Sequence, residues 1–203
     1  MVSFEEEMYY ENGYEPLTQN EKKAICDILN IAEDKLLISN EFGIDFLHAV
    51  ELTGSIYQKT SLVAEKGREL FSYDLSSVVV IWYKVLEKLV REIYVPVIKK
   101  IIPDHQIAPQ HKGEEIAISR IGYNKFTIGN IRVLLGVILE KTDACKAGYG
   151  CLKATCVRRL RTTPFRNIEK VFREAMHKDI THSEANDFVE QVGKEIKYWL
   201  ETI

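Results

Sequence analysis

Residues 17–95 contain no proline, and apolar side chains recur through them at intervals of three and four. This spacing is typical of helices that bury one face. Thr18 and Glu21 form the pattern of a capping box, which predicts a helix that begins at residue 18 and extends to about Ile38. Two further helical stretches follow, at 41–53 and 55–71. The absence of proline favours helices joined by short turns.

The longest predicted helix covers residues 74–98 and begins at Asp74, a residue type that caps helix N-termini. Its apolar face is wide, which is typical of a central, buried helix. Pro96 is expected to kink this helix or to end its first part. The segment that follows, 103–125, contains two prolines and two glycines and predicts a long loop, with a short strand at 116–121.

Helices are also predicted over 127–141, 152–161 and 163–177, and a second capping box, Thr181-x-x-Glu184, opens the final helix. The first of these begins with a threonine cap, and the third begins with threonine followed by proline at the first helical position. Every long segment therefore has helical periodicity, and none repeats another.

The predicted fold class is all-α, a multi-helix up-down bundle with a minor strand or irregular segment around 103–125. We expect an acidic N-terminal arm over residues 1–17 and a single bundle domain over 18–203. A chain of 203 residues is long enough to bury a core of its own.

The net charge of −3 conceals an uneven distribution along the chain. Residues 1–51 carry 12 acidic residues and 3 lysines, a local charge of −9. Residues 145–178 carry 9 lysines and arginines against 2 glutamates, a local charge of +7. Such a basic segment can bind an anion, or it can dock against the acidic part of its own or a sister chain. Charge alone leaves both interpretations open.

The first ten residues, MVSFEEEMYY, lack the basic and apolar stretches of a secretory signal. The longest candidate for a membrane helix, 75–97, is interrupted by five charged residues. We therefore expect a cytoplasmic protein without a membrane span.

Cysteine usage fits that compartment. Cys26 stands alone, whereas the other three cysteines cluster without zinc-ribbon spacing, at Cys145, Cys151 and Cys156. We expect reduced thiols that mostly serve packing. A zinc site completed by His177 or His182, and a redox role, stay open as alternatives.

Common catalytic motifs are absent from the sequence: there is no glycine-rich phosphate loop, no Gly-x-Ser-x-Gly and no His-Glu-x-x-His. Glu114 and Glu115 are adjacent in the predicted loop and are interpreted as solvated. The loop histidines, His105 and His111, are interpreted as surface residues. His48 lies in an apolar helical stretch and is interpreted as a core or boundary residue.

Arg173 and His177 lie four residues apart on a predicted helix, so their side chains share one face. A histidine can exchange a proton near neutral pH, and an arginine can hold a phosphate and stabilise developing negative charge. These roles suffice for metal-independent RNA cleavage, in which a base removes the 2′-OH proton and the hydroxyl attacks the adjacent phosphate. Contacts to the RNA backbone are predicted for Arg158, Arg159, Arg161 and Arg166.

A structural interpretation of the pair stays open beside the catalytic one. The helix dipole alone favours a histidine such as His177 near a helix C-terminus. Arg173 can form an ion pair with Glu169 or Glu174, or cap a neighbouring helix.

Three segments resemble the HEPN superfamily of small helical domains, over about residues 55–203. One is the long helix DLSSVVVIWYKVLEKLVREIYVPVI (74–98), with its small-residue start and aromatic, apolar middle. The second is the C-terminal pair of helices, with Arg173 and His177 at the end of the first and a short Asp-Ile-Thr turn before the next. The third, FTIGNIRVLLGVIL (126–139), looks like a helix of some bacterial members.

The resemblance implies an α-helical bundle that forms a homodimer. Many HEPN proteins are metal-independent endoribonucleases of toxin–antitoxin or phage-defence systems, in which paired Arg-x4–6-His motifs meet across the dimer. Many others are inactive and serve as dimerisation, ligand-binding or adaptor modules. Carried over to this chain, the motif falls on Arg173 and His177, with three intervening residues in place of four to six and Glu174 directly after the arginine.

The sequence therefore predicts a HEPN-like dimeric interaction module associated with RNA or with a protein partner, of a prokaryotic defence or toxin–antitoxin type. The alternative is a metal-independent endoribonuclease that uses Arg173 and His177 in a composite dimer site. Neither function calls for a cofactor or a metal ion.

Overall fold

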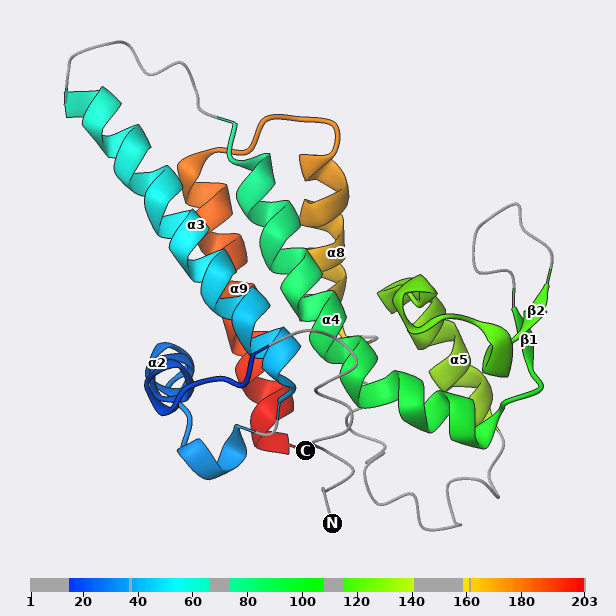
Figure 1. The fold of residues 1–203 in the computed structure, drawn as a ribbon. Coiled ribbons are helices and arrows are strands. Elements are labelled where there is room, and N and C mark those ends of the chain that lie inside the picture. Colours follow the sequence, from blue (N-terminus) through cyan, green and yellow to red (C-terminus); the bar gives the residue numbers. More distant parts are fainter. Residues whose placement is uncertain are drawn as a thin grey trace.

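Figure 1 shows the fold of the chain as a computed structural model. The structure describes residues 15–36, 38–65, 74–107, 115–140, 159–160 and 162–202. The helices are α2 (Gln19–Leu29), α3 (Asn40–Glu65), α4 (Ser76–Ile101), α5 (Ile128–Glu140), α8 (Thr163–Ala175) and α9 (His182–Thr202). The strands are β1 (Gln106–Ile107) and β2 (Ile116–Ala117), and short 3₁₀ turns are η1 (Glu33–Lys35), η2 (Ile118–Arg120) and η3 (Tyr123–Lys125). The fold class is all-α with a minor strand pair, as the sequence predicts.

Helix α4 is the centre of the molecule and packs against α3, α5, α8 and α9. In Figure 1, α3, α4, α8 and α9 lie along one another with alternating chain direction, which gives the up-down arrangement. Helix α2 packs on α3 and α9. The second half of α4 leads away from this bundle toward α5 and the two strands (Figure 1).

Aromatic side chains on α3, α4 and α9 join the helices within a core that is mostly aliphatic. Phe46 meets Trp82 edge to face at 5.6 Å between ring centroids, and Tyr94 meets Trp199 in the same way at 5.6 Å. The indole N–H of Trp82 donates to Thr53 Oγ1 at 2.9 Å, so the buried polar atom of this large residue is satisfied. Helix α4 thus buries side chains against both α3 and α9, which requires a wide apolar face.

Helix α2 begins as predicted and ends earlier than predicted. Its capping box is present, with the Glu21 N–H donating to Thr18 Oγ1 at 3.3 Å and the Thr18 N–H donating to Glu21 Oε2 at 2.7 Å. The prediction of a helix to about Ile38 is wrong, because Asn30 adopts a left-handed conformation at φ 50° and ends the helix. The Lys197 ammonium of α9 donates to the Asn30 carbonyl at 2.6 Å and holds this turn against the bundle.

The two helices predicted over 41–53 and 55–71 form one continuous helix, α3, as far as Glu65. Gly54 lies at the predicted break, and a Cβ built there meets no atom within 4 Å. A single glycine costs a helix only about 1 kcal/mol, which the packing of α3 on α4 overcomes. The last part of the predicted stretch, 66–71, lies outside the described residues.

The N-cap of α4 is Leu75 rather than Asp74, because the helix begins at Ser76, yet Asp74 still acts at this end of the helix. Its carboxylate accepts from the Ser76 N–H at 2.9 Å and from the distant Ile180 N–H at 3.0 Å. Pro96 lies inside the helix with an exposed side chain, and α4 continues through it without the hydrogen bond that residue 96 would donate to the Glu92 carbonyl. Figure 1 shows α4 changing direction in its second half, in agreement with the predicted kink.

The predicted strand at 116–121 is right for its first two residues only. Ile116 and Ala117 pair antiparallel with Ile107 and Gln106. The chain then turns into η2 because Ile118 and Ile121 are drawn into the core, where they are 0% and 3% exposed.

The remaining helix starts follow local capping rules. The Asn130 N–H donates to Thr127 Oγ1 at 3.2 Å, which confirms the cap of α5. Helix α8 is preceded by Thr162 rather than Thr163 at the N-cap, and it ends at Ala175, two residues before His177. The basic helix predicted over 152–161 falls almost entirely outside the described residues.

Two smaller expectations concern single residues. His48 is exposed on α3, so its interpretation as a core or boundary residue is wrong. Cys26 is buried, and burial raises the pKa of its thiol, as expected for a packing residue.

Among the described helices, none combines the length and the apolar character needed to cross a lipid bilayer.

Candidate functional site

Helix α8 carries a row of basic side chains along its outer face. Arg166, Lys170 and Arg173 follow one another at helical spacing, and His177 continues the row in the turn after the helix. All four are exposed. Over eleven residues at a rise of 1.5 Å, the row is about 16 Å long. We call these four residues the α8 basic face.

The opposite side of α8 anchors the helix in the bundle. Phe165 and Ile168 are fully buried, and Ala175 is 7% exposed. The Phe172 ring stacks flat on Tyr83 of α4, with 3.8 Å between centroids and 7° between planes. Because one side is packed so closely, the basic face is held outward on a rigid element.

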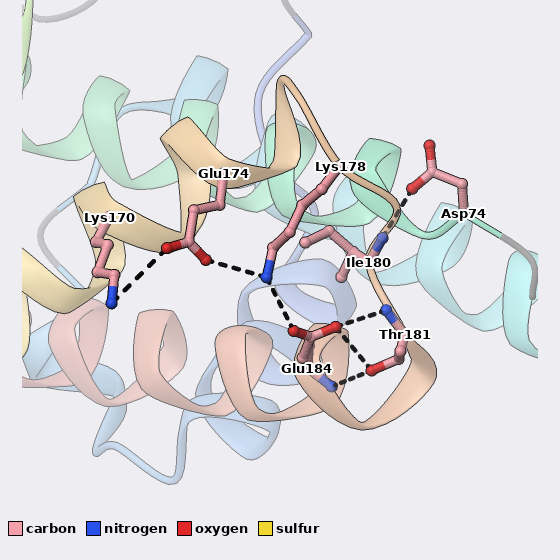
Figure 2. Close-up of polar contacts among 7 residues, drawn as sticks. All are labelled: Asp74, Lys170, Glu174, Lys178, Ile180, Thr181 and Glu184. Atoms are coloured by element: carbon pink, nitrogen blue, oxygen red, sulfur yellow. Dashed lines mark hydrogen bonds and ion pairs between the residues drawn. The ribbon is translucent and has the colours of Figure 1, made fainter.

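Figure 2 shows how carboxylates interleave with the lysines of this region. The Glu174 carboxylate lies 3.7 Å from the Lys170 ammonium and 3.1 Å from that of Lys178. Hydrogen bonding to Lys178 holds the pKa of Glu174 below its ordinary value, and hydrogen bonding to Glu174 raises the pKa of Lys178. The two lysines therefore share one carboxylate, while Lys178 also reaches Glu184 at 3.2 Å.

The turn between α8 and α9 is fixed from both sides (Figure 2). The Ile180 N–H donates to Asp74, and the Ile180 carbonyl accepts from the Leu75 N–H at 3.0 Å. The predicted capping box of α9 is present: the Thr181 N–H donates to Glu184 at 2.9 Å, and hydrogen bonds from Thr181 lower the pKa of Glu184 to about 2. These contacts fix the position of the segment that joins α8 to α9.

Arg173 and His177 line one shallow surface hollow of about 400 Å³ together with Lys170, Glu174 and Lys178. The Arg173 Nε donates to the Glu169 carbonyl at 3.3 Å, so this nitrogen is oriented by its own helix. Within the described part of the chain, no carboxylate forms an ion pair with Arg173 and no side chain orients the His177 ring. The hollow thus offers positive charge and one titratable imidazole to an anion.

The other candidate arginines differ in exposure and in binding partners. Arg166 is exposed on the α8 basic face. Arg159 is bound by the buried carboxylate of Glu195, with Nε and NH2 donating at 3.0 and 2.7 Å, and its guanidinium lies 4.4 Å from the Tyr198 ring centroid. Hydrogen bonding to Glu195 raises the pKa of Arg159, which fits a structural ion pair between the segment that precedes α8 and helix α9. Arg158 and Arg161 lie outside the described residues.

Two lysines of the hollow, Lys170 and Lys178, are missing from the sequence-based candidates. Lys170 could have been found, because it lies four residues after Arg166 and three before Arg173. Lys178 follows His177 in the turn, where helical spacing gives no guidance.

No group of three or more histidine, cysteine, aspartate or glutamate side chains that could hold a metal ion occurs in the described ranges. The cysteines of the zinc alternative, Cys145, Cys151 and Cys156, fall outside these ranges. Comparison with protein-family models, with curated proteins and with solved structures found no match. The function is therefore inferred from the geometry of α8 and of the elements that pack against it.

Proposed function

We propose that the chain is an RNA-associated interaction module that binds phosphate groups through the α8 basic face and acts as a HEPN-like homodimer. One observation carries the proposal: four exposed basic or titratable side chains follow one rigid helix face, and three of them share a hollow with one further lysine. Lysine and arginine side chains arranged along a surface bind the nucleic-acid backbone by charge and release its counterions.

Binding of a fluorescent oligouridine, followed by anisotropy at several salt concentrations, tests this proposal. Lys170→Ala and Arg173→Ala should each weaken binding. Each should also reduce the slope of log K against log salt by about 0.7, the value for one phosphate contact on single-stranded nucleic acid.

Lys194→Ala is the matched control. The Lys194 side chain is 69% exposed and that of Lys170 is 70% exposed, and each forms an ion pair with a glutamate four residues away on its own helix. Lys194 lies on α9, so its loss should leave the affinity and the salt slope unchanged. Equal effects of the two lysine substitutions, or binding that is insensitive to salt, would contradict the proposal.

A metal-independent endoribonuclease is the second candidate, favoured by the shared hollow of Arg173 and His177. In this function the imidazole of His177 removes the 2′-OH proton and Arg173 stabilises the phosphorane. The interaction module ranks first because no described side chain orients the imidazole and because Glu174 places negative charge in the same hollow.

RNA incubated with the protein in EDTA tests the second candidate. Cleavage should leave 2′,3′-cyclic phosphate ends and should be lost in His177→Ala. His48→Ala removes an exposed histidine from α3 and should cleave like the wild type. Cleavage that disappears on chelation would count against this chemistry.

A further inference from the structure

A second arginine lies behind the α8 basic face, on a different helix. Arg132 of α5 forms an ion pair with Glu169 of α8, and the two side chains are 25% and 14% exposed. Glu169 is four residues before Arg173, and its carbonyl accepts from the Arg173 Nε. The pair therefore borders the basic face on the side of α5 and remains partly open to solvent.

Tyr83 of α4 lies near these charges, because its ring stacks on Phe172 of α8. Burial, and next the carboxylates of Glu87 and Glu169, raise the pKa of its phenol, while Arg132 and Arg173 oppose this rise. Both arginines thus oppose the rise of the pKa of one phenol, and both contact Glu169, Arg132 through its carboxylate and Arg173 through its carbonyl. Glu87 is already paired with Arg91, so Glu169 is the carboxylate that neutralises Arg132.

The contact between Arg132 and Glu169 leaves Arg132 incompletely satisfied. Its Nε and NH2 nitrogens are buried, and neither has a hydrogen-bond partner of normal geometry within the described part of the chain, although NH2 forms the ion pair with Glu169. A buried donor without an acceptor is costly, and an arginine presents its nitrogens in a fork suited to two oxygens at once. A phosphate offers more acceptor oxygens than a carboxylate and could satisfy both sides of this fork.

We propose that Arg132 is a latent phosphate-binding residue beside the basic face, and that Glu169 withholds it from nucleic-acid phosphates, so that loss of the carboxylate adds Arg132 to the phosphate contacts. This inference rests on the proposed RNA binding and extends it to α5. The Glu169 carboxylate then competes with other anions for Arg132 and weakens their non-specific binding to it. Without this carboxylate, Arg132 can bind a phosphate directly.

Glu169→Gln is the direct test, with the same oligouridine and salt series. The variant should bind several-fold more tightly at low salt, and its slope should become steeper by about 0.7, the equivalent of one additional phosphate contact. Arg132→Gln combined with Glu169→Gln should return the slope to the wild-type value. A Glu169→Gln slope equal to that of the wild type would overturn the inference.

Two further variants separate this effect from a change in net charge. Glu190→Gln removes one carboxylate that is paired with a lysine on α9 and should not change the slope. Glu169→Asp keeps the net charge, withdraws the carboxylate from Arg132 by one methylene, and should steepen the slope as Glu169→Gln does. It also serves as the test if the Gln variant fails to fold. Equal gains from Glu190→Gln and Glu169→Gln, or a slope for Glu169→Asp equal to that of the wild type, would overturn the inference.

The design distinguishes failure of the inference from failure of the proposed function. If Lys170→Ala and Arg173→Ala weaken RNA binding and Glu169→Gln changes nothing, the basic face binds RNA without Arg132. If the wild type binds no RNA, the proposed function fails, and inorganic pyrophosphate becomes the probe. Pyrophosphate should then raise the melting temperature of Glu169→Gln more than that of the double variant, and equal shifts would overturn the inference.

Discussion

Glu92 of α4 is a partly buried carboxylate that joins two helices. The Ser39 hydroxyl donates to it at 2.5 Å, and the same hydroxyl accepts from the Phe42 N–H at the start of α3 at 3.0 Å. Burial raises the pKa of Glu92 above its ordinary value of 4.5, while the hydrogen bonds from Ser39 and the charge of Lys88 oppose this rise. Burial disfavours the charged form more than these partners favour it.

At the residue scale we predict that Glu92→Gln stabilises the fold at pH 7. A carboxyl whose pKa is raised by folding stabilises the protein below its unfolded pKa and loses that contribution as the pH rises through the folded value. Glutamine does not titrate, so its advantage over the wild type should grow across this range and vanish in acid. Urea unfolding from pH 4 to pH 8 measures the difference.

Glu190→Gln is the control for this prediction. Hydrogen bonding to Lys194 lowers the pKa of Glu190, so its substitution should give the opposite sign of pH dependence. The explanation fails if Glu92→Gln is less stable than the wild type at pH 7, or if the difference does not depend on pH.

At the element scale, we predict that alanine substitutions at two glycines of α3 change the stability of the protein in opposite directions. A Cβ at Gly54 meets nothing within 4 Å, so Gly54→Ala should stabilise the protein by about 1 kcal/mol through helix propensity. A Cβ at Gly43 would overlap Leu17 Cδ1 and would lie 3.3 Å from the Cδ1 atoms of Ile25 and Ile38. Overpacking of this kind costs about 1–3 kcal/mol, so Gly43→Ala should destabilise.

Thermal unfolding of both variants measures these effects. Each variant controls for the other, because the substitution and the helix are the same. A stabilising Gly43→Ala would mean that Leu17 yields easily, and a destabilising Gly54→Ala would contradict the continuity of α3.

At the scale of the whole molecule, the proposed HEPN-like homodimer leads to a prediction about Met176. This side chain is 59% exposed and lies between Arg173 and His177 in sequence, where the resemblance places the dimer contact. Met176→Glu should therefore produce a folded monomer, because a charge cannot be buried there without a partner. Light scattering over a range of concentrations measures the mass.

Ile28→Glu on α2 is the control, since Ile28 is 49% exposed and far from α8 in sequence. It should leave the dimer intact. A wild-type protein that is monomeric at every concentration would remove the dimer from the proposed function.

Local rules account for what the sequence alone determined. The caps at Thr18, Thr127 and Thr181, the role of Asp74 and the shared face of Arg173 and His177 all depend on residues a few positions apart. Backbone geometry dictates these relations wherever a helix forms, and the apolar periodicity shows that helices form. The all-α class follows from the same periodicity.

Only the tertiary structure decided where helices end and which charges meet. Helix α3 continues through Gly54 because α4 packs along it, and α2 stops at Asn30, where α9 supplies Lys197. Arg159 meets Glu195, and Arg132 meets Glu169, each across 36 or more positions of the chain. No local spacing encodes such pairs, because the packing of whole helices brings their side chains together.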